Sequence, residues 1–300
     1  MPDLGALGEA YHQLREIEHT RMGARYTASM LDDTPVVVLA IAPDVAARIQ
    51  WPDVFDAELQ RAAAVHHEAI IPLLVWGSLS DGTLHCAYVR PDRDELVPGS
   101  LAPAVIAEIG VRLARALTAS HAAGAVHGSI TTSRIVMTRD RGAQLGDLGL
   151  FAALNAGGLG VHATSTLLSD QVYVSPEVQS GNAPDECSDV YSLGASLYEL
   201  LTGKPPYGGR TTNHVLASVL SPESGGGATE AATNAVVDAI VRAIEHGRAD
   251  RWPDAAAFAA ALAAGIAQPR GSPPTSRRGC VPKAAAALAI ASAAIVAANS

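Results

Sequence analysis

The sequence predicts an α+β protein in which a small β-rich lobe with one helix precedes a larger, mainly α-helical lobe. A continuous β-branched run at 36–41, bounded by prolines, indicates a buried strand. The stretch 70–89 reads as two strands joined at Asp81-Gly82, which is a strong hairpin signal. From about residue 100 the apolar residues recur at helical spacing, and this change of period marks the second lobe.

Helical periodicity also places the individual helices. The helix of the first lobe is expected over 54–65, where Phe55 and Leu59 share one face. A glycine at 203 follows another periodic stretch and is typical of a helix end. The helices of the second lobe are expected near 106–117, over 189–201, near 231–246 and over 254–265.

Composition limits the class of protein. The chain has 300 residues, 48% of them hydrophobic, which suits one large domain or two lobes with a tail. A net charge of −9 argues against nucleic-acid binding and leaves a basic protein partner open. The three cysteines lie too far apart for a disulfide framework or a zinc site, so we interpret them as small free thiols in a reducing compartment.

The end of the chain differs from the body. We divide the sequence into a domain at 1–269 (lobes at about 11–90 and 95–268), a basic linker rich in proline and serine at 270–283, and an apolar, alanine-rich segment at 284–300. The uncharged run from Ala284 to Ala298 is shorter than the roughly 20 residues that span a bilayer. We interpret it as the start of a transmembrane helix whose basic flank keeps the body cytoplasmic. The alternative is an alanine-rich tail without membrane contact.

Four motifs between residues 121 and 207 carry a specific resemblance. In order they are HAAGAVHGSITTSRIV, LGDLGL, YVSPEV and SDVYSLGASLYELLTGKPPY. Together, and at this spacing, they closely resemble the bacterial eukaryotic-type Ser/Thr protein kinases, over about residues 11 to 262. The resemblance implies a bilobal protein-kinase-like fold. In that family the fold positions the ATP γ-phosphate, neutralises its charge with metal ions and orients the accepting hydroxyl.

The positions that hold the nucleotide in this family are altered here. Glu18 and Thr20 stand where the first two glycines of the phosphate-covering loop are expected. Leu39 replaces the strand lysine that binds the α- and β-phosphates, and no lysine occurs anywhere before Lys204. Arg48, the nearest following base, is expected to face solvent, so we find no substitute for the lysine. Glu58 matches the lysine's usual partner.

The positions that perform the chemistry are altered as well. Ser129 replaces the aspartate that accepts the substrate proton, and Thr131 replaces the lysine that steadies the transferring phosphoryl group. Arg134 replaces the asparagine of the second metal site, and an arginine repels a metal cation. Asp170 replaces the threonine that bridges the catalytic aspartate and lysine. Asp147 alone remains, as a candidate Mg²⁺ ligand or as a hydrogen-bonding loop carboxylate.

The positions that hold this fold together are retained. Glu177 and Arg251 match a buried ion pair that ties the activation segment to the lower helices. Asp189 matches the helix residue that holds the backbone of the catalytic loop. His127 matches the histidine that packs beneath the metal loop. Retained architecture with altered chemistry is typical of a pseudokinase.

We therefore expect a catalytically impaired, kinase-like signalling or scaffold module that binds protein partners at the cytoplasmic face of the membrane. No cofactor is expected, and ATP with Mg²⁺ would bind only if residual affinity survives. The candidate contacts are Gly23, Ala87, Tyr88 and Val89. Two alternatives stay open: a weak or atypical Ser/Thr kinase, and a nucleotide-binding switch that needs no metal.

Hydroxyl residues in the stretch 162–169 suggest regulation. The sequence predicts an exposed loop here, on which another kinase would phosphorylate Thr164, Ser165, Thr166 or Ser169. The expected partner is then an active kinase or a phosphopeptide-reading domain. A polar loop without modification is the alternative.

Overall fold

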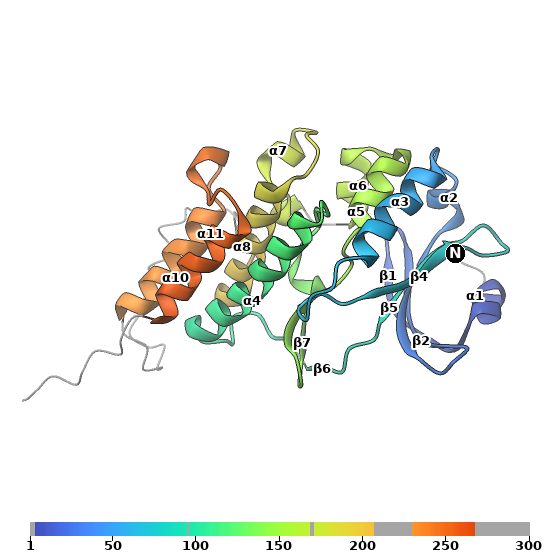
Figure 1. Ribbon diagram of the computed structural model, residues 1–300, viewed down its shortest axis with the longest axis horizontal. Helices are drawn as coiled ribbons and strands as arrows, with labels where there is room; N and C mark the ends of the chain where they lie inside the picture. Colours follow the sequence, from blue (N-terminus) through green and yellow to red (C-terminus); the bar gives the residue numbers. More distant parts are fainter. Residues whose placement is uncertain (1–3, 95, 169–170, 207–229, 268–300) are drawn as a thin grey trace, which may run out of the picture. The chain divides into compact units, whose positions relative to one another are not determined.

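The computed structural model describes residues 4–94, 96–168, 171–206 and 230–267. The first lobe is a five-stranded antiparallel sheet of strand order β1-β2-β3-β5-β4 (Figure 1). Its strands are β1 (Tyr11–Thr20), β2 (Gly23–Met30), β3 (Pro35–Ile41), β4 (Leu73–Ser78) and β5 (Leu84–Val89). The expected helix is α3 (Pro52–Ala63), and two short helices that the sequence pattern did not predict join it, α1 (Leu4–Ala10) and α2 (Pro43–Ala46).

The second lobe is mainly helical, which confirms the predicted α+β bilobal fold. Its principal helices are α4 (Pro103–Ala122), α8 (Glu186–Thr202), α10 (Glu230–Ala243) and α11 (Ala255–Ala267). A small sheet consists of β6 (Arg93–Asp94), β7 (Ile135–Thr138) and β8 (Gly142–Leu145), and β6 and β7 are seen between α4 and the strands of the first lobe in Figure 1. The connecting turns include η1 (Thr132–Arg134), η3 (Gln171–Tyr173), α7 (Pro176–Gln179) and η4 (Arg248–Asp250).

Strand β3 is buried on both faces, which explains its unbroken β-branched sequence. Val36 and Val38 pack into the cluster against β1 and β2, whereas Leu39 and Ile41 pack on the other face against α3. Phe55 and the residues one turn apart from it on α3 cover that face. The central strand therefore fixes the position of α3 relative to the sheet.

Helix α8 is the centre of the second lobe. Asp185 caps its first turn, because the side chain accepts a hydrogen bond from the Ser188 amide at 3.0 Å while Ser188 Oγ bonds back to the Asp185 amide. The helix ends at Gly203, which adopts the left-handed conformation that favours glycine. Nearly every residue between these ends is buried, so α8 carries the core contacts to α4, α10 and α11.

The segment after Asp147 is helical, so the exposed loop predicted for 162–169 is wrong. It forms α5 (Leu150–Leu154), the single π-helical turn η2 (Asn155–Leu159) and α6 (Val161–Leu168). Thr164 and Ser165 are buried in α6, because an apolar face of this helix packs toward the first lobe. Thr166 is exposed, and Ser169 lies outside the described residues.

The predicted linker and apolar tail, 270–300, also lie outside the described residues, so their assignment stays a prediction. Within the described part of the chain, no helix has the length and hydrophobicity that crossing a membrane requires. Cys86 and Cys187 are free and buried, while Cys280 lies in the undescribed tail.

Candidate nucleotide cleft

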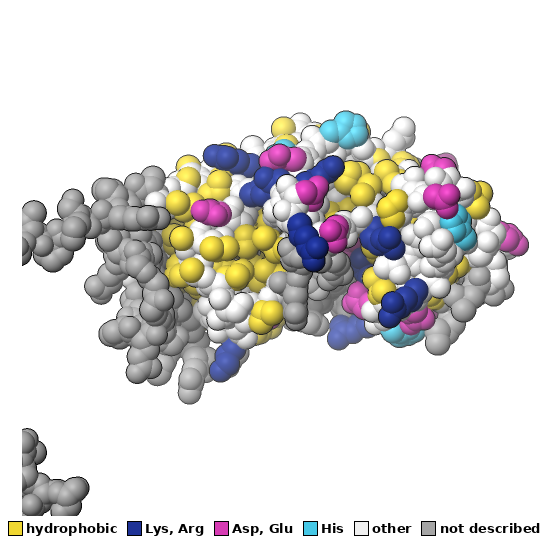
Figure 2. All heavy atoms as spheres, turned by 90° about the horizontal axis from the view of Figure 1, so that it is seen from below, with side chains coloured by type: hydrophobic (Ala, Val, Ile, Leu, Met, Phe, Trp, Pro, Cys, Tyr) yellow, Lys and Arg dark blue, Asp and Glu magenta, His cyan; other side chains and the backbone are white. Residues whose placement is uncertain are grey.

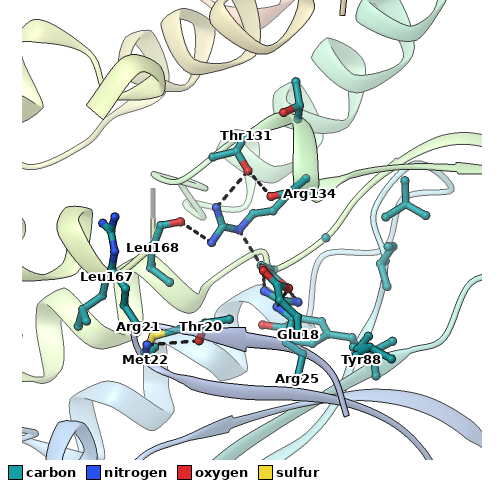
Figure 3. A pocket seen from close by; sticks show the side chains of 18 of the residues that line it. Glu18, Thr20, Arg21, Met22, Arg25, Tyr88, Thr131, Arg134, Leu167 and Leu168 are labelled. Carbon is teal, nitrogen blue, oxygen red and sulfur yellow. Dashed lines mark hydrogen bonds and ion pairs between the residues drawn. The ribbon is translucent and has the colours of Figure 1, made fainter. Parts of the chain in front are cut away.

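A cleft of about 720 Å³ lies between the two lobes (Figure 3). Strands β1 to β3 and the end of β5 line it from the first lobe, and the loop around η1, strand β7 and the end of α6 line it from the second. Its apolar lining includes Val37, Ile71, Val89 and Val136. Its polar lining includes Thr131, Arg134 and Asp147, which the sequence analysis placed in the catalytic-loop and metal-loop motifs.

Two arginines hold the Asp147 carboxylate at the polar end of the cleft. Arg25 donates to it with two nitrogens: Nη1 lies 3.2 Å from Oδ1, and Nη2 contacts Oδ2. Arg134 Nε lies 2.9 Å from the same Oδ2. The Asp147 side chain is only 4% exposed. Both carboxylate oxygens are therefore occupied by guanidinium groups.

Arg25 is the functional residue that sequence reasoning missed. In the antiparallel pairing of β2 with β3, Arg25 lies directly opposite Leu39, the position of the absent lysine. Paired residues of an antiparallel ladder point to the same face of the sheet. The neighbouring strand therefore places a cation opposite the position of the absent lysine, which the sequence analysis did not predict. The pairing register of β2 with β3 would have identified Arg25, because it places this residue opposite Leu39. Arg48 is exposed, as expected.

Arg134 is built into the cleft floor by hydrogen bonds from all three of its guanidinium nitrogens. Besides Asp147, they reach the Ser129 carbonyl at 2.7 Å, the Thr131 hydroxyl at 3.3 Å and the Leu168 carbonyl at 2.7 Å. A buried guanidinium needs such complete pairing to offset its desolvation. Arg134 therefore connects the catalytic-loop segment to the end of α6.

Electrostatics fix the charge state of this cluster. Burial alone would raise the pKa of Asp147, but the charges of Arg25 and Arg134 and their hydrogen bonds outweigh burial and hold it well below its ordinary value. Burial opposes the charge on Arg25, yet Asp147 raises the Arg25 pKa above its ordinary value. Asp147 is thus a carboxylate at every physiological pH, paired with two cations.

This arrangement does not fit a magnesium ion. Mg²⁺ requires carboxylate oxygens in an octahedral shell at close range. Here both Asp147 oxygens already accept hydrogen bonds, and two positive groups lie where the ion would approach. The other expected metal ligand is Arg134 itself. In the part of the chain that the structure describes, no group of three or more acidic, histidine or cysteine side chains offers a metal site.

Other positions named from the kinase motifs differ in their surroundings. Leu39 is fully buried in the core beneath α3. Glu58 pairs with Arg61 on its own helix at 2.6 Å. The Ser129 hydroxyl is buried and has no hydrogen-bond partner among the described residues, whereas Thr131 bonds to Ser133 at 2.9 Å. Asp170 lies outside the described residues.

Two of the four candidate binding residues line the cleft and two do not. Tyr88 and Val89 line it, whereas Gly23 and Ala87 are absent from its walls. Gly23 is required by the sheet, because a Cβ there would lie 1.9 Å from the carbonyl oxygen of Ala40. The Tyr88 hydroxyl is buried and unpartnered among the described residues. Burial, with a smaller contribution from nearby Cys86 and Asp147, raises the pKa of Tyr88 well above 10.

Asp189 and His127 hold the loop that leads to Ser129. The Asp189 carboxylate accepts hydrogen bonds from the backbone amides of His127 and Gly128, at 2.8 and 2.7 Å, and from His121 Nε2 at 2.9 Å. His127 Nε2 lies 2.8 Å from the Gly146 carbonyl, immediately before Asp147. These bonds fix the loop backbone independently of the altered side chains on it.

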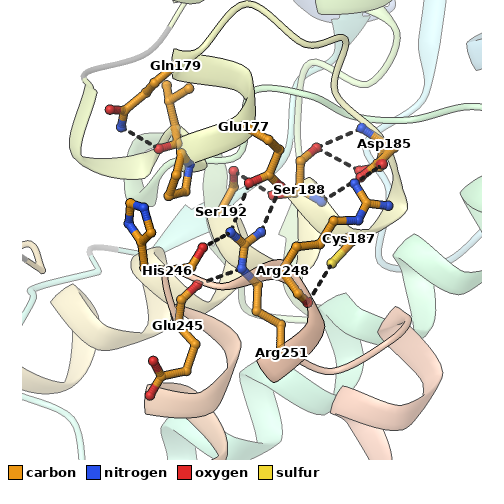
Figure 4. A network of polar contacts seen from close by, with 12 residues as sticks. Glu177, Gln179, Asp185, Cys187, Ser188, Ser192, Glu245, His246, Arg248 and Arg251 are labelled. Atoms are coloured by element: carbon orange, nitrogen blue, oxygen red, sulfur yellow. Dashed lines mark hydrogen bonds and ion pairs between the residues drawn. The ribbon is translucent and has the colours of Figure 1, made fainter.

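Glu177 and Arg251 form a second, largely buried ion pair within the second lobe (Figure 4). Arg251 Nη1 and Nη2 lie 2.7 and 2.9 Å from the two Glu177 oxygens. The same guanidinium donates to the carbonyls of Glu245 and His246 and lies over the Tyr191 ring at 4.8 Å. This pair ties α7 to the turn before α11.

The comparisons with known proteins agree with this architecture. The protein kinase domain family matches residues 11–245 of the chain. The chain belongs to the protein kinase family. The Mycolicibacterium smegmatis Ser/Thr-protein kinase PknB is 33% identical over 161 residues, covering 51% of this chain and 26% of PknB. Mycobacterium tuberculosis PknB is 31% identical over 163 residues, covering 52% of this chain and 26% of that protein.

Solved structures support the same kinase fold. The crystal structure of the Mycobacterium tuberculosis PknI kinase domain superposes with a TM-score of 0.66 at 22% identity, covering 85% of this chain and 96% of that one. At this identity the likeness concerns the fold alone. This kinase-family chain spans less than a third of the length of the curated relatives it matches.

Proposed function

We propose that this member of the protein kinase family is a signalling or scaffold module that does not transfer phosphate from Mg²⁺–ATP. The proposal rests on one observation above all: both oxygens of Asp147 are held by Arg25 and Arg134. A kinase needs that carboxylate for the metal ion that neutralises the phosphates. In this chain the side chains of Arg25 and Arg134 neutralise the carboxylate instead of a metal ion.

The other altered positions point in the same direction. Ser129 offers no carboxylate to orient an accepting hydroxyl, and Thr131 offers no charge for the transferring phosphoryl group. The end of α6 also lines the cleft and is tied to its charged residues, because the carbonyls of Thr166 and Leu168 accept hydrogen bonds from Arg21 and Arg134. Each of these features removes a different requirement of phosphoryl transfer.

The partner we propose is a protein: an active kinase or a phosphopeptide-reading domain. Charges of both signs are interspersed on the face shown in Figure 2, which does not resemble the continuous basic stripe typical of nucleic-acid binding. Thr166 is the exposed hydroxyl of α6 that a partner kinase would reach. Anchoring of this module at the cytoplasmic face of a membrane through residues 284–300 is part of the same proposal.

A phosphate-transfer assay tests the proposal. Purified protein would be incubated with γ-labelled ATP, Mg²⁺ or Mn²⁺ and a general protein substrate, beside the Asp147→Asn variant. We expect no transfer above that variant. Transfer that Asp147→Asn abolishes would overturn the proposal.

A second candidate, a weak or atypical Ser/Thr kinase, is favoured by the comparisons, since the relatives carry the name of Ser/Thr-protein kinases. In this reading Arg25 takes over the role of the strand lysine and releases Asp147 when nucleotide arrives. The two readings differ in one measurable consequence. For a weak kinase Arg25→Ala would abolish residual transfer, whereas for the proposed module wild type and variant are equally inactive.

A further inference from the structure

The loop that leads into α3 presents an aromatic side chain to solvent (Figure 1). Among the described residues, Trp51 is the only exposed phenylalanine, tyrosine or tryptophan, and it is 55% exposed. Val54 follows within the first turn of α3 and is 44% exposed, and Pro52 between them is exposed as well. Residues three apart at a helix start lie on the same side. Trp51, Pro52 and Val54 therefore form one exposed apolar surface, which we call the α3 patch.

Tryptophan at position 51 is unfavourable for the helix that it precedes. Trp51 is the N-cap residue of α3, and its side chain makes no hydrogen bond to the first turn. Serine, threonine, aspartate or asparagine at this position would supply that bond and stabilise the helix. The ring also buries less than half of its surface within the fold. A residue that breaks a local rule without a compensating contact inside the protein points to a role in binding.

The backbone that carries the Trp51 ring is held in place. The carbonyl of Gly157 in η2 accepts hydrogen bonds from the amides of Gln50 at 2.7 Å and Trp51 at 3.1 Å. Ile49, in the same loop, packs against the core beneath α3. A side chain on a fixed backbone loses little conformational entropy when a partner covers it. Trp51 thus has the residue type and the support that are typical of a binding hot spot.

The charges around the α3 patch are mainly negative. Asp53 and Asp56 are exposed on either side of Val54, and Asp44 is exposed on α2. Between residues 43 and 60 the only base is Arg48. Asp53 also favours the start of α3 through the helix dipole, but the dipole does not require three exposed carboxylates. The surroundings of the α3 patch therefore favour a basic partner over an acidic one.

We infer that the α3 patch is a docking surface for a basic, amphipathic segment of the protein partner. The apolar side chains of that segment cover Trp51 and Val54, and its lysine or arginine side chains lie against Asp53 and Asp56. The inference rests on the proposed function in one respect, namely that the partner is a protein. It adds the place at which the partner binds and the chemistry that recognises it. None of these four residues lines the cleft, so docking here leaves the cleft accessible.

Fluorescence anisotropy of labelled peptides with the full chain tests the inference. The probes are two amphipathic model peptides of equal length, one of leucine and lysine and one of leucine and glutamate. We expect saturable binding of the lysine peptide by the wild type and at least about tenfold weaker binding by Trp51→Ser. Serine supplies the missing N-cap hydroxyl, so the Tm of this variant should not fall. Equal binding of the lysine peptide by both proteins, or of both peptides by the wild type, would overturn the inference.

Two further variants separate the α3 patch from general stickiness and general charge. Leu31→Ser is the matched control, because Leu31 in the turn between β2 and β3 is 76% exposed. It should bind the lysine peptide like the wild type. The double variant Asp53→Asn with Asp56→Asn should bind about fivefold more weakly and with a smaller dependence on salt. An equal loss of affinity in Leu31→Ser and Trp51→Ser would overturn the inference.

Sedimentation velocity of the full chain examines a second copy as the occupant. We expect the same sedimentation coefficient for the wild type and Trp51→Ser over a range of concentrations. Self-association that Trp51→Ser abolishes would mean that another copy of this chain covers the α3 patch, and would overturn the inference of a basic partner.

The phosphate-transfer assay keeps the docking surface and the proposed function separable. Absence of peptide binding together with absence of transfer contradicts the docking surface and leaves the non-catalytic module standing. Transfer that Asp147→Asn abolishes contradicts the non-catalytic module, whereas peptide binding that depends on Trp51 still supports the docking surface.

Discussion

Two arginine–carboxylate sites of this molecule can be compared directly. At the base of the second lobe, Arg251 holds both oxygens of Glu177, as the kinase resemblance leads one to expect. In the cleft, Arg25 and Arg134 hold both oxygens of Asp147, at positions where the resemblance implies a lysine and metal ions. The two sites use the same chemistry. One matches an ion pair expected from the family resemblance, and the other places arginine side chains where the resemblance implies metal ions.

This difference shows how a fold can keep a cleft after its charges have changed. The metal ions of a kinase help to neutralise carboxylate and phosphate charges between the lobes. In this chain the guanidinium of a β2 residue pairs with Asp147 and links the first lobe to the second. Under our proposal this pairing stabilises the cleft without a bound ion or nucleotide.

The strongest test of the first site is Arg251→Ala. It leaves Glu177 half-buried without its partner and should lower the free energy of unfolding by about 3–5 kcal/mol, measured by urea denaturation. Arg248→Ala is the matched control, because Arg248 pairs with Asp185 at the surface and is 55% exposed. It should cost at most about 1 kcal/mol. Equal losses in the two variants would contradict a special role for the Glu177–Arg251 pair.

The corresponding test of the cleft is Asp147→Asn, measured in the presence of a chelator. Arg134 would then be buried without its counter-ion and Arg25 would keep only Glu18, so we expect a loss of about 2–4 kcal/mol in the metal-free protein. Asp140→Asn is the control, since Asp140 pairs with Arg141 at the exposed surface. An Asp147→Asn variant as stable as the wild type, or more stable, would contradict a stabilising contact of Asp147 with Arg25 and Arg134.

Much of this architecture could be predicted from the sequence, because it depends on local periodicity and on motifs at fixed spacing. The helices α3, α4 and α8 and the hairpin of β4 and β5 follow from apolar spacing and turn residues. The Glu177–Arg251 pair is present where motif order suggested it. These features could be predicted because apolar spacing and turn residues lie within short stretches of sequence, and because the ion pair lies at positions that the kinase motifs identify.

The cation in the cleft could not be predicted in this way. Arg25 acts through its cross-strand pairing with Leu39, and register is set by the whole sheet rather than by neighbouring residues. The helical form of 161–168 was missed for a similar reason. Its polar composition reads as a loop, but burial of Thr164 and Leu168 against other elements decides its structure. Long-range contacts overrode the local signal in both cases.

A smaller expected effect is a pH dependence of stability that comes from the contact between His121 and Asp189, which supports the catalytic-loop segment and not the cleft. Burial opposes protonation of His121, but the hydrogen bond and charge of Asp189 outweigh it and raise the His121 pKa above 6.5. The protonated pair therefore stabilises the fold fully below pH 6.5 and loses this contribution as the pH rises through the folded-state pKa. We expect His121→Gln to lose about 1 kcal/mol at low pH and to flatten this dependence.

Urea unfolding curves of the wild type and of His121→Gln, measured from below to above pH 6.5, would check this predicted pH dependence. A wild-type stability that rises with pH above 6.5, and a His121→Gln variant that follows the same curve, would contradict the assignment. A change at Asp147 should leave this part of the profile intact, because its pKa lies far below the window.

The smallest effect concerns Cys86, which lies behind the cleft on β5. Burial raises its pKa to about 12, so the thiol stays protonated and unreactive near neutral pH. We expect no alkylation of Cys86 in the folded protein and rapid alkylation after unfolding, as read by peptide mass spectrometry. Labelling of the folded protein at a rate close to that of a free thiol would mean that the cleft opens widely.

The binding of Mn²⁺ in the presence of ATP, followed by electron paramagnetic resonance of the full chain, tests the central claim most directly. If the arginines occupy Asp147, wild type and Asp147→Asn will both leave the Mn²⁺–ATP complex unbound by protein. Saturable binding of Mn²⁺ by the wild type that Asp147→Asn removes would show that the carboxylate is available to a metal, and would contradict the account of a cleft closed by its own cations.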